Sequence, residues 1–392
     1  MKYDFDVIID RTNSDSLKYD FAVRRGKPDG ILPLWVADMD FMTAPCVVEA
    51  LMNKIRHGVF GYSESRQDYV DVLQKWFSVS FDWTIEPNWL VKTPGVVYSI
   101  CTAIRALTSK GDSILIQQPV YYPFTESIQI NDRKLVINQL VYTDGKYAID
   151  FQDFEDKITQ NDVRMFILCS PHNPVGRVWT KEELVRLGDI CLKHGVTVVS
   201  DEIHADFVYP GYKHHVFAGL KPEFSEITIT CTAPSKSFNL AGLHIANIFI
   251  ASRNIRQRFR QEMAKSGLSQ MNVMGFTACR AAYAYGREWL TELKAYIAGN
   301  LSFIKNYISE EISEIKLVEP QGTYLAWLDF YDLELDHSKL EDLIINKAGL
   351  WLDSGKMFGV GGESFQRINI ACPRQILEKA LVRLAKAING ST

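Results

Sequence analysis

A single lysine follows a strongly apolar run in the middle of the chain. Lys236 lies in the segment TAPSKSFNLAGL (residues 232–243), directly after the run ITITCT (residues 227–232). Such a run is typical of a strand buried on both faces, so we expect the amine at the edge of a core sheet and not on a solvated helix. An amine in that place needs a partner or a function, and general-base catalysis is one such function.

Polar residues also follow two other apolar runs. Asn173 lies in SPHNPVGR, and Asp201 and His204 lie in SDEIHADF. In open α/β sheets, ligands bind beyond the carboxyl ends of the strands. We therefore expect these three residues and Lys236 to share one rim of a sheet.

Asp201 closes a hydrophobic strand. A carboxylate there is costly to bury unless it meets a cation or several donors, and a protonated ring nitrogen would serve. Strand alternation directs Glu202 to the opposite face, so at most one of the two faces a common site, and we choose Asp201. The structural alternative, a helix cap or a pairing with arginine, stays open.

The segment KTPGVVYSICTAI (residues 92–104) has the features of a phosphate site at the start of a helix. The N–H groups of Val96 and Val97 are free at a helix N-terminus, and Gly95 lets a ligand approach the backbone. We expect Val97, Cys101 and Ile104 to face inward. On its own this signal is weak, because most helices that begin this way bind nothing.

A metal site is the alternative interpretation of the histidines. His214 and His215 could join Asp201 and His204 in a cluster, but the chain has no HExxH motif and no tight pairing of ligands on a helix. The seven cysteines include no pair within four residues of each other, which excludes CxxC spacing. We therefore expect no metal and a reducing compartment.

Short apolar runs alternate with amphipathic stretches from about residue 90 to 280, which is the pattern of βαβ units. Between two of these runs, Thr180 and Glu183 predict a capping box, and Gly195 predicts the end of the helix. The predicted strands comprise residues 113–118, 165–171, 196–203, 227–232 and 245–251.

The pattern changes after residue 280, where long helical stretches flank shorter strands. We expect a large domain of residues 46–282 and a small domain formed by residues 1–45 and 283–392. The N-terminal segment should pack on the C-terminal part and border a shared cleft. The predicted late helices comprise residues 288–313, 338–348 and 374–388.

The composition of the chain limits the kind of molecule that it is expected to bind. The chain has 392 residues, of which 47% are hydrophobic, and a formal net charge of −4. This charge gives no field for nucleic acid or an anionic membrane, and no stretch approaches the roughly 20 apolar residues of a membrane helix. We expect a cytoplasmic protein that acts on a small molecule.

A lysine after one strand, an aspartate after a second, Asn-Pro-x-Gly after a third and a glycine-led helix upstream are together far more specific than each alone. With PLWVADMDF, PVYYPF, GTYLAWLDF and INIACPR, they make the chain resemble fold-type I, pyridoxal-phosphate-dependent enzymes of the class I/II aminotransferase superfamily. The resemblance is closest to the cystathionine β-lyase (cysteine-S-conjugate β-lyase) branch. It implies the aspartate aminotransferase-type α/β fold, with three layers, a mostly parallel central sheet and a smaller α+β C-terminal domain.

The resemblance implies a cofactor, pyridoxal 5′-phosphate, and roles around it. Lys236 would bind the cofactor covalently, Asp201 would pair with its pyridinium nitrogen, and Asn173 would donate to its phenolic oxygen. Tyr121 would stack on the ring and, with Lys236 and Asp201, be catalytic. His204 takes the place where many aminotransferases have a tyrosine that contacts the same phenolic oxygen.

The resemblance also assigns the phosphate and the neighbouring subunit. Gly95, Val96, Val97 and Ser235 would hold the phosphate. Tyr62, in GYSE, matches the tyrosine that reaches the phosphate of the neighbouring subunit. A homodimer with shared active sites is therefore implied.

Two further positions concern the substrate and the branch of the family. Arg367, in FQRINIA, matches the arginine that grips the substrate's α-carboxylate, with Asn173 beside it. Aspartate aminotransferases carry a phosphate-binding arginine eight residues after the lysine, where this chain has His244. The lyase branch generally lacks that arginine, so the difference favours the lyase.

The activity implied is a carbon–sulfur β-lyase that cleaves L-cystathionine and related cysteine S-conjugates to a thiol, pyruvate and ammonia. If the abstracted proton returns to the cofactor instead, the outcome is transamination, so an aminotransferase is the alternative. A lyase with an additional regulatory, protein-binding role is the second alternative, because members of this branch can act through protein contacts.

Overall fold

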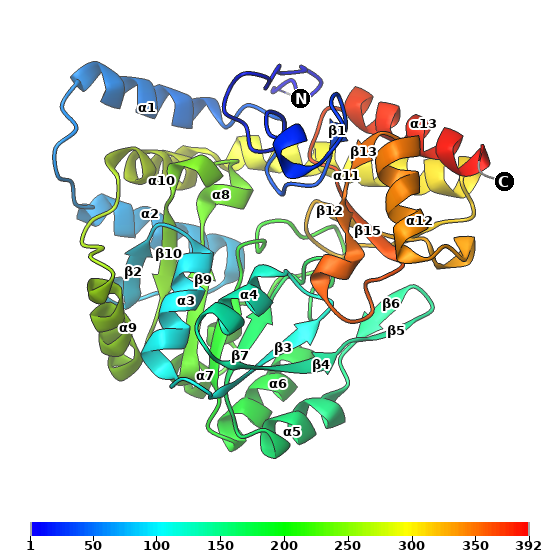
Figure 1. The fold of residues 1–392 in the computed structure, drawn as a ribbon. Helices are drawn as coiled ribbons and strands as arrows, with labels where there is room; N and C mark the ends of the chain where they lie inside the picture. The colour runs from blue at the N-terminus through cyan, green and yellow to red at the C-terminus, as the bar shows by residue number, and fades with distance from the viewer. Residues whose placement is uncertain (1, 391–392) are drawn as a thin grey trace.

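The computed structural model describes residues 2–390, and a seven-stranded sheet forms the centre of its larger part (Figure 1). Its strands are β2 (Leu90–Thr93), β3 (Ser113–Gln118), β4 (Lys134–Gln139), β7 (Val163–Cys169), β8 (Thr197–Asp201), β9 (Thr228–Thr232) and β10 (Ala246–Phe249). Their order is β2-β10-β9-β8-β7-β3-β4. Neighbours from β9 to β4 pair in parallel, and β10 runs antiparallel to both β2 and β9. The mostly parallel sheet predicted from the sequence is thus confirmed.

Helices cover both faces of this sheet. Ile114 and Ile116 of β3 belong to the core under α3, α4 and α9, whereas Leu115 belongs to the core under α5, α6 and α7. Strand alternation produces this division, and the result is a three-layer α/β fold. The helices are α3 (Val96–Leu107), α4 (Pro123–Ile130), α5 (Phe151–Gln160), α6 (Lys181–Lys193), α7 (Pro222–Ile227) and α9 (Arg253–Lys265).

The local signals in the sequence are largely confirmed. Residues 113–118 coincide with β3, and three of the other predicted strands contain β8, β9 and β10. The predicted strand 165–171 overlaps β7, which begins and ends two residues earlier. The Thr180 hydroxyl accepts from the Glu183 N–H at 3.2 Å, and the Glu183 carboxylate accepts from the Thr180 N–H at 2.8 Å. Gly195 follows α6 with φ +66°, a conformation that glycine adopts without strain.

The inward face of α3 differs from the prediction. Val97 is exposed and Cys101 is half-buried, whereas Val96 and Ile100 are buried together with the expected Ile104. Apolar residues occupy most of this helix, so periodicity alone did not select between two adjacent stripes. The packing of α3 on the sheet and on α9 selects the stripe of Val96 and Ile100.

A second, four-stranded antiparallel sheet has the order β11-β12-β15-β14. Its strands are β11 (Lys316–Val318), β12 (Leu325–Asp329), β14 (Asp353–Ser354) and β15 (Phe365–Asn369). The helices around it are α11 (Arg287–Glu311), α12 (His337–Asp342) and α13 (Arg374–Asn389). The predicted helix at 338–348 is α12 followed by a π-helical turn, Leu343–Lys347. The division into domains at residues 46 and 282 stays a prediction.

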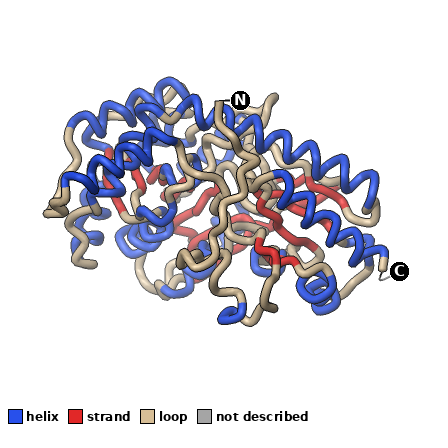
Figure 2. Tube along the Cα trace, turned by 90° about the horizontal axis from the view of Figure 1, so that it is seen from above, coloured by secondary structure: helices blue, strands red, loops and turns tan. Residues whose placement is uncertain are grey.

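The N-terminal segment runs largely as loop across the middle of the molecule (Figure 2). Its strand β1 (Leu32–Pro33) pairs in parallel with β13 (Leu350–Trp351), so this segment packs on the C-terminal part, as predicted. The remaining elements are α1 (Pro45–His57), α2 (Gln67–Phe81), α8 (Pro234–Ser237), α10 (Val273–Tyr285) and the hairpin of β5 (Val141–Thr143) and β6 (Lys146–Ala148). Among residues 2–390, no helix combines the length and the apolarity that a membrane crossing requires.

Candidate active site

A cavity of about 480 Å³ opens at the carboxyl ends of the central strands. Cys169 at the end of β7, Asp201 at the end of β8 and Ala233 after β9 form part of its wall. This is the position at which open α/β sheets bind ligands. The residues singled out from the sequence that line the cavity are Gly95, Val96, Val97, Tyr121, Asn173, Asp201, His204, Ser235 and Lys236.

Lys236 projects from the four-residue helix α8. Its Nζ donates to the Ala37 carbonyl at 2.6 Å. Burial, and then the positive charge of Arg367, lower the pKa of Lys236 to about 8, although Asp38 and Asp201 oppose this shift. A substantial fraction of this amine is therefore neutral near pH 8, and a neutral amine can accept a proton.

Asp201 is buried at the end of β8. Its Oδ1 accepts from the Ile203 N–H at 3.1 Å, and no ion pair to it occurs within residues 2–390. Burial raises the pKa of Asp201 to about 7, against the Ile203 hydrogen bond and the charge of Lys236, which lower it. A cation brought next to this carboxylate would favour its ionised form.

Glu202 faces away from the cavity, as strand alternation predicted. Its carboxylate accepts from the Ser200 hydroxyl at 2.8 Å and from the Phe217 N–H at 3.0 Å, and it pairs with His214 Nε2 at 2.9 Å. His204 lies instead in the cavity wall. The histidines of the metal hypothesis therefore belong to different surroundings, and the described chain contains no group of three metal-ligating side chains.

His204 is a buried histidine with an unused nitrogen. Its Nδ1 has no hydrogen-bond partner among the described residues. Burial, followed by the charges of Lys236 and Arg367, lowers the pKa of His204 well below its usual value. The ring is therefore neutral at physiological pH, and one of its nitrogens is available to a ligand in the cavity.

The N-terminus of α3 forms the anion-binding end of the cavity. Gly95 precedes the helix, and no side chain caps the first-turn amides of Val96 and Val97. A Cβ built on Gly95 would meet no heavy atom within 4 Å, so the space beside Gly95 is open, and Val96 and Val97 line the same cavity. Ser235, in α8, lines the same cavity. Free amides, the helix dipole and a hydroxyl group together suit a phosphate.

Tyr121 and Asn173 lie in different loops, and a hydrogen bond between their backbones joins them. The Tyr121 N–H donates to the Asn173 carbonyl at 3.0 Å, and both side chains line the cavity. Burial raises the pKa of Tyr121, so its phenol is neutral at physiological pH. Asn173 Oδ1 accepts from Arg367 Nη1 at 3.1 Å, which links the cavity wall to strand β15.

Arg367 lies behind Asn173 and is not among the residues that line the cavity. Its Nη2 donates to the Trp35 carbonyl at 2.7 Å and pairs with the buried carboxylate of Asp353 on β14. Its Nε is buried without a hydrogen-bond partner in the described chain. Sequence reasoning missed Asp353, because the two-residue strand β14 gives no periodic signal.

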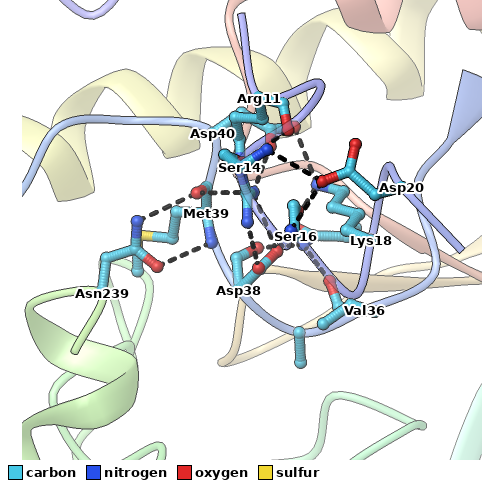
Figure 3. Close-up of polar contacts among 12 residues, drawn as sticks. Arg11, Ser14, Ser16, Lys18, Asp20, Val36, Asp38, Met39, Asp40 and Asn239 are labelled. Atoms are coloured by element: carbon cyan, nitrogen blue, oxygen red, sulfur yellow. Dashed lines mark hydrogen bonds and ion pairs between the residues drawn. The ribbon is translucent and has the colours of Figure 1, made fainter. Parts of the chain in front are cut away.

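The segment after β1 borders the cavity, as expected from the sequence. Ala37 lines the cavity, and its carbonyl accepts from Lys236 Nζ and from the Tyr324 hydroxyl, the latter at 2.9 Å. Asn239, shortly after α8, binds the backbone of Met39 twice: its Oδ1 accepts from the Met39 N–H at 3.0 Å and its Nδ2 donates to the Met39 carbonyl at 2.9 Å (Figure 3). Lys236 and Asn239, which are close in the sequence, thus both bind the backbone of the segment after β1.

Two acidic residues anchor this segment from the other side. Lys18 Nζ lies 2.7 Å from Asp40 Oδ2, and both side chains are buried. Arg11 pairs with Asp38 at 2.6 Å and with Asp40 at 2.7 Å (Figure 3). These ion pairs form a partly buried network that fixes the segment.

Tyr62 does not reach the cavity of its own chain. Its side chain is 99% exposed, in the connection between α1 and α2. His244, in contrast, lines the cavity and has φ +48°. The structure therefore brings together every predicted cavity residue except Tyr62 and Arg367.

This chain is similar to known proteins over most of its length. The family model for aminotransferase class I and II matches residues 29–384. The chain belongs to this family.

Relatives within the family include carbon–sulfur lyases. The cystathionine beta-lyase PatB of Bacillus subtilis is 40% identical to this chain, over 98% of it and 100% of PatB. A crystal structure of cystalysin from Treponema denticola, which contains a pyridoxal 5′-phosphate cofactor, matches with a TM-score of 0.97 and 38% identity over all of both chains. The pyridoxal-phosphate-bound C-S lyase of Staphylococcus hominis matches with a TM-score of 0.92 and 30% identity over 98% of both chains.

Proposed function

We propose that this chain is a pyridoxal-phosphate-dependent carbon–sulfur β-lyase. It cleaves L-cystathionine and related cysteine S-conjugates to a thiol, which is homocysteine for cystathionine, together with pyruvate and ammonia. The observation that carries the proposal is the 40% identity, over nearly all of both chains, to a relative named cystathionine beta-lyase. The resemblance found in the sequence leads to the same activity.

The side chains of the cavity fit pyridoxal 5′-phosphate. The open space beside Gly95, together with the amides of Val96 and Val97, suits the phosphate. The buried Asp201, which has no cationic partner in the described chain, suits a protonated ring nitrogen, and the Lys236 amine suits the aldehyde. When bound, this cofactor supplies an electron-withdrawing ring that stabilises negative charge at the substrate's Cα.

Lys236 is the proposed base for the Cα proton. Its pKa of about 8 keeps part of the amine neutral at physiological pH, and the Ala37 carbonyl fixes Nζ at the cavity wall. Arg367 and Asn173 are proposed to bind the substrate's α-carboxylate, because the buried Nε of Arg367 is an unused donor beside the Asn173 amide. Asp201, once ionised, would balance the positive charge of the ring nitrogen.

The elimination then breaks the bond between Cβ and sulfur in the substrate. The electrons of the Cα–H bond form the Cα=Cβ double bond, and those of the Cβ–S bond leave with the thiolate. A free thiol has a pKa of about 8.5, so the thiolate is a good leaving group, and Lys236 can return the abstracted proton to it. Aminoacrylate and one water yield pyruvate and ammonia.

We also infer that the active form is a homodimer. The outer face of α1 exposes Val48, Met52 and Ile55 at helical spacing, and Phe60 continues this apolar surface toward the fully exposed Tyr62. Large exposed apolar side chains that gather on one helix face are typical of a protein–protein interface. A second copy of the chain would cover it and supply a cavity for Tyr62.

A direct assay tests the lyase. The holoenzyme is given L-cystathionine, and pyruvate is followed with lactate dehydrogenase while free thiol is followed with a thiol reagent. We expect equal amounts of both products, and none from Lys236→Ala. If neither appears and 2-oxoglutarate instead supports amino-group exchange, the chain is an aminotransferase. A partner protein bound independently of Lys236 would support the additional regulatory role.

A further inference from the structure

Two adjoining cavities lie outside the candidate active site, between α2, α11 and the segment that follows β8. The first has a volume of about 360 Å³, and its wall is mainly polar. The second has a volume of about 390 Å³, and its wall is mainly apolar. Val208, Tyr212 and Lys294 line both, and no residue of either wall lines the active-site cavity.

The polar cavity carries an excess of positive charge. Lys213, Arg287 and Lys294 line it together with a single carboxylate, Asp206. Lys294 is half-buried and makes no hydrogen bond or ion pair with any described residue. Arg287 donates to the Ser80 hydroxyl at 3.0 Å and forms no ion pair within residues 2–390. Of the three cations only Lys294 is partly buried, whereas Lys213 and Arg287 are exposed. A partly buried cation without an ion-pair partner favours a bound anion, and the two further positive charges in the wall add to this attraction.

Asp206 does not compensate these charges fully. Its carboxylate is already engaged, because it accepts from the Ser237 hydroxyl and from Trp76 Nε1, the latter at 3.2 Å. Burial raises the pKa of Asp206, against the Ser237 hydrogen bond and the positive charge of Lys294, which lower it. Ser237 directly follows Lys236, so this carboxylate also connects the cavity to the helix turn of the proposed base.

The second cavity adds an apolar compartment beside the cations. Phe207, Pro210 and Ile297 contribute to its wall, and Lys294 stands at the boundary with the polar cavity. The hydroxyl of Tyr209, also in this wall, is buried and has no hydrogen-bond partner among the described residues. An occupant of both cavities would place an acidic group among the cations and an apolar body between α11 and residues 207–212.

We propose that the two cavities form one binding site for a small amphipathic carboxylate, separate from the site of the lyase reaction. Lys294 and Arg287 bind the carboxylate head, and the apolar compartment holds the body. This site does not depend on the proposed lyase activity, because it shares no residue with the active-site cavity.

Calorimetry on the holoenzyme tests the site, with 3-phenylpropionate as the probe and its uncharged amide as the control ligand. We expect the acid to bind and the amide to bind much more weakly. Lys294→Met should weaken binding of the acid by at least about tenfold, because it removes a charged donor. The matched control is Lys305→Met, which removes an exposed lysine from the same helix α11, where it pairs with Glu319, and it should leave the affinity unchanged.

A further variant separates this site from the active site, which also binds carboxylates in the proposed function. Arg367→Met should leave the binding of 3-phenylpropionate unchanged. The proposal is overturned if Arg367→Met abolishes binding while Lys294→Met does not, if the amide binds as tightly as the acid, or if the acid does not bind at all. The cofactor absorbance of each variant confirms that it is folded and loaded.

Discussion

Burial shifts Lys236 and Asp201, two ionisable groups of the cavity, toward their neutral forms. It lowers the pKa of Lys236 to about 8 and raises the pKa of Asp201 to about 7. Both shifts have desolvation by burial as the largest cause. A neutral amine is what a base for the Cα proton requires, whereas Asp201 needs a nearby cation to become an effective anion.

The first prediction concerns the stability of the cofactor-free protein. The folded-state pKa of Asp201, about 7, lies above its unfolded value, so the folded state binds more protons between about pH 4 and pH 7. Stability contributed by Asp201 therefore falls as the pH rises through this window, by up to about 4 kcal/mol. The free energy of unfolding is measured with urea at both ends of this pH window. It should not show the fall in Asp201→Asn, whereas the exposed control Asp71→Asn should retain it. If the unfolding free energies of wild type and Asp201→Asn changed equally with pH, the raised pKa would not belong to Asp201.

The second prediction concerns Asp353, whose carboxylate holds the buried Arg367 in place. Asp353→Asn should raise the KM for L-cystathionine by about tenfold and change kcat much less, because the α-carboxylate is bound equally before and during the reaction. Asp353→Glu should restore part of the affinity. A fall in kcat with an unchanged KM would show that Asp353 does not act through Arg367.

At the scale of elements, the segment Trp35–Phe41 connects parts that are distant in the sequence. Its carbonyls accept from Lys236 at Ala37 and from Arg367 at Trp35. Asn369, on the same strand as Arg367, donates to two further carbonyls of the segment. One short loop thus positions the proposed base and the proposed carboxylate-binding arginine relative to each other.

The third prediction tests the anchor of this segment. Lys18→Met removes one cation from the buried Asp40 and should cost about 3 kcal/mol of unfolding free energy in a denaturant titration. Adding Asp40→Asn should recover part of this loss. Lys2→Met, which breaks the exposed pair with Glu288, is the control and should have no measurable effect. Equal small losses for both lysine variants would contradict a structural role for the Lys18 pair.

The sequence predicts those features that local pattern determines. The strands of the central sheet appear as apolar runs, and Asn173, Asp201 and Lys236 follow these runs directly, so their common rim is predictable. The pairs Lys18–Asp40 and Arg367–Asp353 depend on contacts between loops and short strands that have no periodicity. They become visible only once the fold brings these parts together.

At the scale of the whole molecule, three parts of one chain meet at the proposed site. The central sheet contributes Asp201, and helix α8, which follows β9, contributes Lys236. The N-terminal segment contributes Ala37, and the four-stranded sheet contributes Arg367 behind Asn173. The exposed Tyr62 lies outside this cavity. If Tyr62 acts on the phosphate, it acts in a second copy of the chain, and the two sites of a dimer are then mutually dependent.

Subunit complementation tests this dependence. Lys236→Ala removes the base, and Tyr62→Ala removes the exposed ring, so each homodimer should be impaired at both sites. In a mixed dimer, one site would combine the intact Lys236 of one chain with the intact Tyr62 of the other. Random reassociation of equal amounts should therefore restore about a quarter of the wild-type sites. If Tyr62 served its own chain, every site would still lack one of the two residues, and mixing would restore no activity above that of the separate variants.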